Sequence, residues 1–131
     1  MPKSIRQTCT LPAPPRTVYE ALMDSRKHAA FTGQPASISK KVGGKITAFG
    51  DYIEGKNLQL VPNRKIVQSW RGSDWPEGLF SKATFALSSA GKGTKLTFTQ
   101  TGVPDAQFKS IRQGWKDFYW KPLAEWLANK K

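Results

Sequence analysis

The sequence predicts an α+β domain in which a curved antiparallel sheet of about six to seven strands wraps around a long C-terminal helix. Two short helices are expected after the first strand. Three observations predict this class: an alternating N-terminal segment, turn signals about every 8–14 residues in the middle, and a helical apolar stripe at the end. A single sheet with one apolar face needs a cover, and only the C-terminal segment is long and apolar enough to provide it.

The first strand is predicted over residues 4–11. Ile5, Gln7, Cys9 and Leu11 fall on one face of this segment, and polar residues fall on the other. A period of two is typical of a strand buried on one side. We therefore expect the thiol of Cys9 to be packed and inert rather than nucleophilic.

Two short helices are predicted next. Pro15 suits the first turn of a helix, and apolar residues at spacings of three and four extend this helix to about Met23. Asp24 can cap a second helix that Gly33 ends. His28 lies on this short polar helix, where we expect it to be partly exposed on the surface.

Six further strands are expected to form an antiparallel meander. Short turn sequences such as Pro62-Asn63 and Gly91-Lys92-Gly93 separate the extended segments, and short connections favour antiparallel pairing. The expected strands are 36–40, 45–49, 52–61, 65–71, 79–88 and 94–101.

The chain is expected to end in an amphipathic helix of about 24 residues that begins near Asp105. Pro122 falls inside the pattern and predicts a kink about one turn before it. No linker or repeat interrupts the sequence, so we expect one domain over residues 1–131. The predicted apolar stripe consists of Phe108, Ile111, Trp115, Phe118, Tyr119, Leu123, Trp126 and Leu127.

The space between sheet and helix is the candidate site. Two glutamines fall on inward strand faces, where they are either hydrogen-bonded core amides or groups that recognise a ligand. The aromatic residues around them either fill the core or form the wall of a cavity. The candidate wall residues are Gln68, Trp70, Phe85, Phe98, Gln100, Trp115 and Tyr119.

Composition narrows the function classes. The net charge is +12, but basic residues are spread along the chain in runs no longer than pairs, so specific nucleic-acid binding is not expected. An acidic protein or an anionic ligand would be attracted by the same charge. No signal peptide or apolar stretch of about 20 residues is found, which favours a soluble cytoplasmic protein. With one His and one Cys, no metal site or cofactor is predicted.

Motifs along most of the chain resemble the C-terminal domain of the heat-shock protein 90 ATPase activator. They include Val42-Gly43-Gly44-Lys45, Gly55-Lys56-Asn57-Leu58, Ile66-Val67-Gln68-Ser69-Trp70-Arg71, Ser73-Asp74-Trp75-Pro76-Glu77-Gly78, Gln100-Thr101-Gly102-Val103-Pro104 and Tyr119-Trp120-Lys121-Pro122-Leu123. The resemblance implies the helix-grip fold of the SRPBCC superfamily, which includes START-like and birch-pollen-allergen-like proteins. It also implies heat-shock protein 90 as a partner.

Three functions remain open from the sequence. The first is a non-enzymatic protein that binds a small apolar or amphipathic ligand in the cavity. The second is a co-chaperone module that binds heat-shock protein 90 and stimulates its ATPase. The third is a cyclase-like or other enzyme that uses the cavity, although no catalytic residue can be named. Trp75 is either a contact for a partner or a lid over the end of the sheet.

Overall fold

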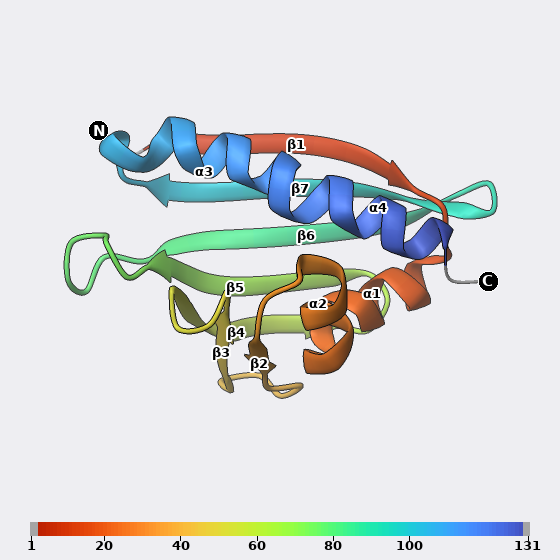
Figure 1. The fold of residues 1–131 in the computed structure, drawn as a ribbon, viewed down its shortest axis with the longest axis horizontal. Helices are drawn as coiled ribbons and strands as arrows, with labels where there is room; N and C mark the ends of the chain where they lie inside the picture. The colour runs from red at the N-terminus through yellow and green to blue at the C-terminus, as the bar shows by residue number, and fades with distance from the viewer. Residues whose placement is uncertain (1–2, 130–131) are drawn as a thin grey trace.

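A computed structural model describes residues 3–129 as one seven-stranded antiparallel sheet with helices on one face (Figure 1). The strand order is β1-β7-β6-β5-β4-β3-β2. The strands are β1 (Lys3–Leu11), β2 (Ala36–Ile38), β3 (Lys45–Ala48), β4 (Ile53–Val61), β5 (Lys65–Gly72), β6 (Ser81–Ala90) and β7 (Gly93–Val103). The short helices are α1 (Pro15–Met23) and α2 (Ser25–Thr32).

The predicted element order is confirmed, with small shifts at strand ends. The strand expected over 36–40 ends at Ile38, and the one expected over 79–88 begins at Ser81. The boundary between the short helices is as predicted, since an Asp24 carboxylate oxygen accepts a hydrogen bond from the Lys27 backbone N–H at 3.1 Å. Gly33 ends α2 in the left-handed conformation, at φ 75°.

The C-terminal helix lies across the concave face of the sheet, as Figure 1 shows. It is held to the edge strand β1 by one side chain. The Trp120 indole N–H donates to Gln7 Oε1 at 2.6 Å, and Gln7 Nε2 donates to the Arg112 carbonyl at 2.9 Å. β1 in turn pairs with β7, where Gln7 is opposite Phe98. These bonds fix the position of the helix over the sheet.

The C-terminal helix is continuous but irregular. It comprises a short 3₁₀ turn (Asp105–Gln107), α3 (Phe108–Gly114), the π-helix η2 (Trp115–Trp120) and α4 (Lys121–Ala128). The irregularity lies where the sequence predicts it, just before Pro122, whose ring and missing N–H are incompatible with a regular helix. The Lys121 N–H accordingly bonds the Lys116 carbonyl, five residues back.

The π-helix changes which side chains face the core. Five of the predicted stripe residues are buried, but Phe118 is 58% exposed. Trp120, which is absent from the predicted stripe, is 7% exposed. The prediction for Phe118 is wrong because it assumes an α-helical period, whereas a π-helix takes more residues per turn and rotates the following side chains. The buried stripe residues are Ile111, Trp115, Tyr119, Leu123 and Leu127.

The altered helical phase predicts unequal effects of two alanine substitutions. Trp120→Ala removes a buried side chain and the bond to Gln7, so it should lower the free energy of unfolding by about 3–5 kcal/mol. Phe118→Ala removes an exposed ring and should cost less than about 1 kcal/mol. Urea denaturation of both full-length variants measures the difference. Equal losses would contradict the π-helical phase.

Candidate functional site

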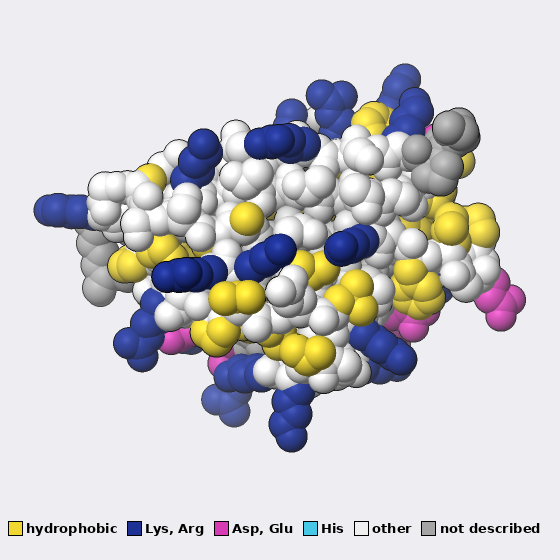
Figure 2. Space-filling view, turned by 180° about the vertical axis from the view of Figure 1, so that it is seen from behind, with side chains coloured by type: hydrophobic (Ala, Val, Ile, Leu, Met, Phe, Trp, Pro, Cys, Tyr) yellow, Lys and Arg dark blue, Asp and Glu magenta, His cyan; other side chains and the backbone are white. Residues whose placement is uncertain are grey.

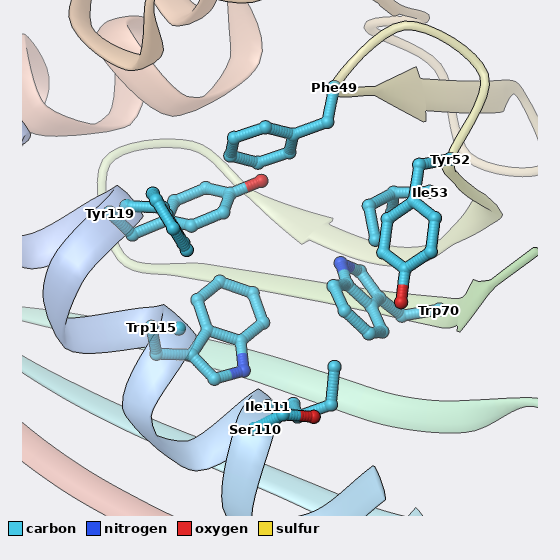
Figure 3. Close-up of a pocket in the computed structure, with 10 residues that line it drawn as sticks. Phe49, Tyr52, Ile53, Trp70, Ser110, Ile111, Trp115 and Tyr119 are labelled. Carbon is cyan, nitrogen blue, oxygen red and sulfur yellow. The ribbon is translucent and has the colours of Figure 1, made fainter. Parts of the chain in front are cut away.

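An apolar pocket of about 310 Å³ lies between the C-terminal helix and the middle of the sheet (Figure 3). Its floor is formed by the side chains of Trp70, Trp115 and Tyr119, all of which are buried. Its rim includes Tyr52 and Phe118, which are exposed. Ligand sites in proteins commonly have volumes of about 300–1,000 Å³, and the volume of this aromatic pocket is at the lower end of that range.

The predicted wall residues divide between the pocket and a filled core. Trp70, Trp115 and Tyr119 line the pocket. Phe98 is fully buried and packs on Trp115, with ring centroids 4.2 Å apart, and Phe85 lies 5.1 Å from Phe98. Some of the predicted aromatic residues therefore line an open pocket, and others fill the core in a different part of the interior.

The two buried glutamines are hydrogen-bonded within the protein. Gln100 is fully buried, its Oε1 accepts from the Trp115 indole N–H at 2.8 Å, and its Nε2 donates to Ser81 Oγ at 2.8 Å. Gln68 Nε2 donates to Asn57 Oδ1 at 3.1 Å. Neither glutamine lines the 310 Å³ pocket. Gln100 instead fixes the orientation of the Trp115 ring in the pocket floor.

Gln68 and Phe85 line a second, much smaller void of about 20 Å³ beside the pocket. A void of that size holds about one water molecule and no organic ligand. His28 and Tyr119 also line it. Tyr119 thus separates the small void from the larger pocket.

His28 is buried, not partly exposed as the sequence predicts. Its side chain is 4% exposed, and its Nε2 lies 3.1 Å from the Tyr119 hydroxyl. Burial lowers the pKa of His28 from 6.5 to about 4, so the imidazole is neutral near pH 7. The prediction fails because the partner that covers His28 lies in the C-terminal helix, far away in the sequence.

Of the two placements predicted for Trp75, a contact for a partner and a lid over the end of the sheet, the structure shows the lid. Trp75 is 4% exposed and its ring centroid lies 5.5 Å from that of Trp70. Arg71 secures the loop by donating to the Trp75 carbonyl at 2.8 Å and to Glu54 at 2.9 Å. Trp75 therefore packs over the end of the sheet and supports the Trp70 wall from behind.

Sequence reasoning missed the rim on the β3–β4 turn. Phe49 adopts a positive φ of 51°, which is uncommon for a bulky residue and is found mostly where the surroundings enforce it. Its ring packs on Tyr119 and Phe118, with centroids 5.6 and 6.2 Å apart. The one available signal is the pair of aromatic residues, Phe49 and Tyr52, that flank Gly50-Asp51 between the strands expected over 45–49 and 52–61.

Few polar groups face the pocket. The Tyr52 hydroxyl donates to Asp74 at 2.7 Å, and the Ser110 hydroxyl donates to the Gln107 carbonyl at 3.1 Å. In Figure 3 the indole nitrogen of Trp70 points toward the open space of the pocket. The arrangement suits a largely apolar molecule that carries one hydrogen-bond acceptor.

Other reactive groups are sparse. No cluster of three potential metal ligands occurs among residues 3–129. Cys9 is half-buried on the inward face of β1, and burial raises the pKa of its thiol to about 11, so it is protonated near pH 7. Within the same residues, no helix is long and apolar enough to cross a membrane.

The curved sheet, the helix that it encloses and the pocket between them define a helix-grip domain. Residues 12–128 match the family described as "Activator of Hsp90 ATPase homolog 1-like protein", and the chain belongs to this family. It is 36% identical over 103 residues to an activator of 90 kDa heat shock protein ATPase homolog from Dictyostelium discoideum, covering 78% of this chain and 27% of that protein.

Two further relatives extend the comparison. The human activator of 90 kDa heat shock protein ATPase homolog 1 is 30% identical over 111 residues, covering 85% of this chain and 33% of that protein. The chain thus spans about a third or less of these curated relatives. The crystal structure of an Hsp90 activator from Plasmodium falciparum superposes with a TM-score of 0.90 at 25% identity, covering 95% of this chain and 96% of that one.

Burial of neutral His28 predicts a stability loss in mild acid. The unfolded chain binds a proton at His28 near pH 6.5, whereas the folded chain does so only near pH 4. The contribution of His28 to the free energy of unfolding should therefore fall by up to about 3 kcal/mol as the pH drops through this window, and it should not change further below the window. Urea denaturation at several pH values measures the slope. A His28→Gln variant should have a shallower slope, and an unchanged slope would contradict the assignment.

Proposed function

We propose that this chain binds Hsp90 and stimulates its ATPase, as the names of its relatives state for those proteins. The observation that carries the proposal is the family match over residues 12–128, nearly all of the described chain. The Plasmodium falciparum structure supports it, because that chain is described as an Hsp90 activator and corresponds to this chain over 96% of its length.

Purified Hsp90 provides the test. Adding the chain should raise the rate of ATP hydrolysis until it saturates with the concentration of the chain. Because the chain carries a charge of +12, added salt should shift the half-saturating concentration upward. An unrelated protein of equal net charge is the control. An equal rise with that control, or no rise at concentrations that give measurable binding, would refute the proposal.

A second candidate function is the binding of a small, mainly apolar molecule. The pocket favours it, because about 310 Å³ remains open between aromatic walls that could otherwise pack together. A donor at Trp70 Nε1 would orient one acceptor of the ligand, and the hydrocarbon part would contact Trp115 and Phe118.

Gly114 allows the pocket to be filled without altering its aromatic walls. The residue lines the pocket at a helical φ of −58°, and an added Cβ would meet only Phe118, at an ordinary contact distance of 3.7 Å. Gly114→Leu should therefore abolish binding of a fluorescent fatty-acid analogue.

Gly114→Ala is the matched control. It should retain binding of the probe and raise the free energy of unfolding by about 0.5–1 kcal/mol, because alanine favours the helix more than glycine does. Fluorescence titration and thermal melts measure both effects. Absence of probe binding by the wild type, or full affinity in Gly114→Leu, would exclude this pocket as the binding site.

A further inference from the structure

The face of the sheet that points away from the helices carries most of its charge as isolated cations. Figure 2 shows this face, with Lys and Arg side chains across its middle and Asp and Glu side chains near its margins. The inward positions on each strand are buried core residues, so the alternate positions point outward. The outward cations, one from each of six strands, are Arg6, Lys45, Lys56, Lys65, Lys82 and Lys95.

Register places some of these cations side by side. Lys45 is directly opposite Lys56 in the β3–β4 pair. Lys56 is opposite Ser69, and Ser69 is opposite Lys82, so three lysines lie in one row across four strands. Like charges directly opposite each other destabilise a sheet. The fold therefore keeps a repulsive arrangement that an acidic partner would relieve.

Within residues 3–129, none of these six cations forms an ion pair. The ion pairs of residues 3–129 involve other basic residues, namely Arg16, Lys27, Lys40 and Arg71. The acidic residue at an outward strand position is Glu54, and Arg71 already binds it at 2.9 Å. The net charge of +12 attracts an acidic partner to the chain, and these cations are available to bind it at this face.

We propose that this outer face binds an acidic, extended segment of a partner protein. Strands lie about 4.8 Å apart, so the row of Lys45, Lys56 and Lys82 covers roughly 14 Å, which an extended segment of about five residues spans. Lysine ammonium groups pair with its carboxylates, and threonine hydroxyls between them, such as Thr84, Thr97 and Thr99, can donate hydrogen bonds.

The surface suits a protein better than a nucleic acid. Among residues 3–129, the exposed aromatic side chain at this face is Phe80, just before β6, and Arg71 already lies over its ring, 5.8 Å from the centroid. One such ring does not provide the succession of stacking positions that a single-stranded nucleic acid uses. The outer face of the described sheet also presents no projecting helix or β-ribbon that could enter a groove of a duplex. The face lies on the opposite side of the sheet from the pocket, so this inference requires neither the pocket nor Hsp90.

Two matched triple variants test the proposal on the full chain. The first replaces outward lysines: Lys56→Gln, Lys82→Gln and Lys95→Gln. The second removes the same charge from exposed positions of the C-terminal helix: Lys109→Gln, Lys116→Gln and Lys121→Gln. Because all six lysines are exposed, neither variant should melt below the wild type, and the sheet variant should melt slightly above it because it relieves the repulsion between Lys45 and Lys56.

The probe is a peptide of about eight glutamates, added to the protein at low salt. Changes in the amide chemical shifts of the protein locate the binding site, and titration with the peptide gives the affinity. Shifts should concentrate on the outward positions of β3 to β7, and the sheet variant should bind about tenfold more weakly. The helix variant should bind less than about twofold more weakly. Equal weakening of both variants, no binding by the wild type, or tighter binding of an oligothymidylate of equal length would overturn the proposal.

Discussion

The structure depends on one constraint: the apolar concave face of a single sheet must be covered, and the C-terminal helix provides most of the cover while α1 and α2 complete it. Two indole N–H groups on the C-terminal helix secure the cover. Trp115 donates to Gln100 on β7, and Trp120 donates to Gln7 on β1. A buried donor without a partner would cost about 1–3 kcal/mol, so these bonds restrict the helix to one position on the sheet. Gln7 and Gln100 thus hold the helix against the sheet.

The π-helix connects this constraint to the pocket. By altering the helical phase, it turns both Tyr119 and Trp120 toward the core and leaves Phe118 at the surface, where its ring meets that of Phe49. Two of the three floor residues, Trp115 and Tyr119, and the rim residue Phe118 therefore come from one irregular segment. π-helical turns occur often at functional sites, because an altered phase presents side chains that a regular helix would bury or expose differently.

The two sides of the sheet differ in chemistry. The inner side combines a filled aromatic core around Phe98 with an open pocket near Trp70. The outer side is cationic, as Figure 2 shows, and carries threonine side chains such as Thr84, Thr97 and Thr99. Strand alternation makes this separation possible, because neighbouring residues of one strand point to opposite faces. One sheet can therefore offer a site for an apolar molecule and a separate surface for an acidic one.

Three features of the fold could be predicted from the sequence: the order of the elements, the Asp24 cap between the short helices and the helical irregularity before Pro122. Each of them depends on local periodicity or on local backbone chemistry. Three other features depend on tertiary contacts. His28 is buried beneath Tyr119, and Trp120 takes the place of Phe118 in the core. The aromatic residues around Trp70 leave a pocket open instead of packing together. The periodicity of a sequence shows which residues lie on the same face of a helix or strand. Whether that face is buried depends on what another part of the chain places against it.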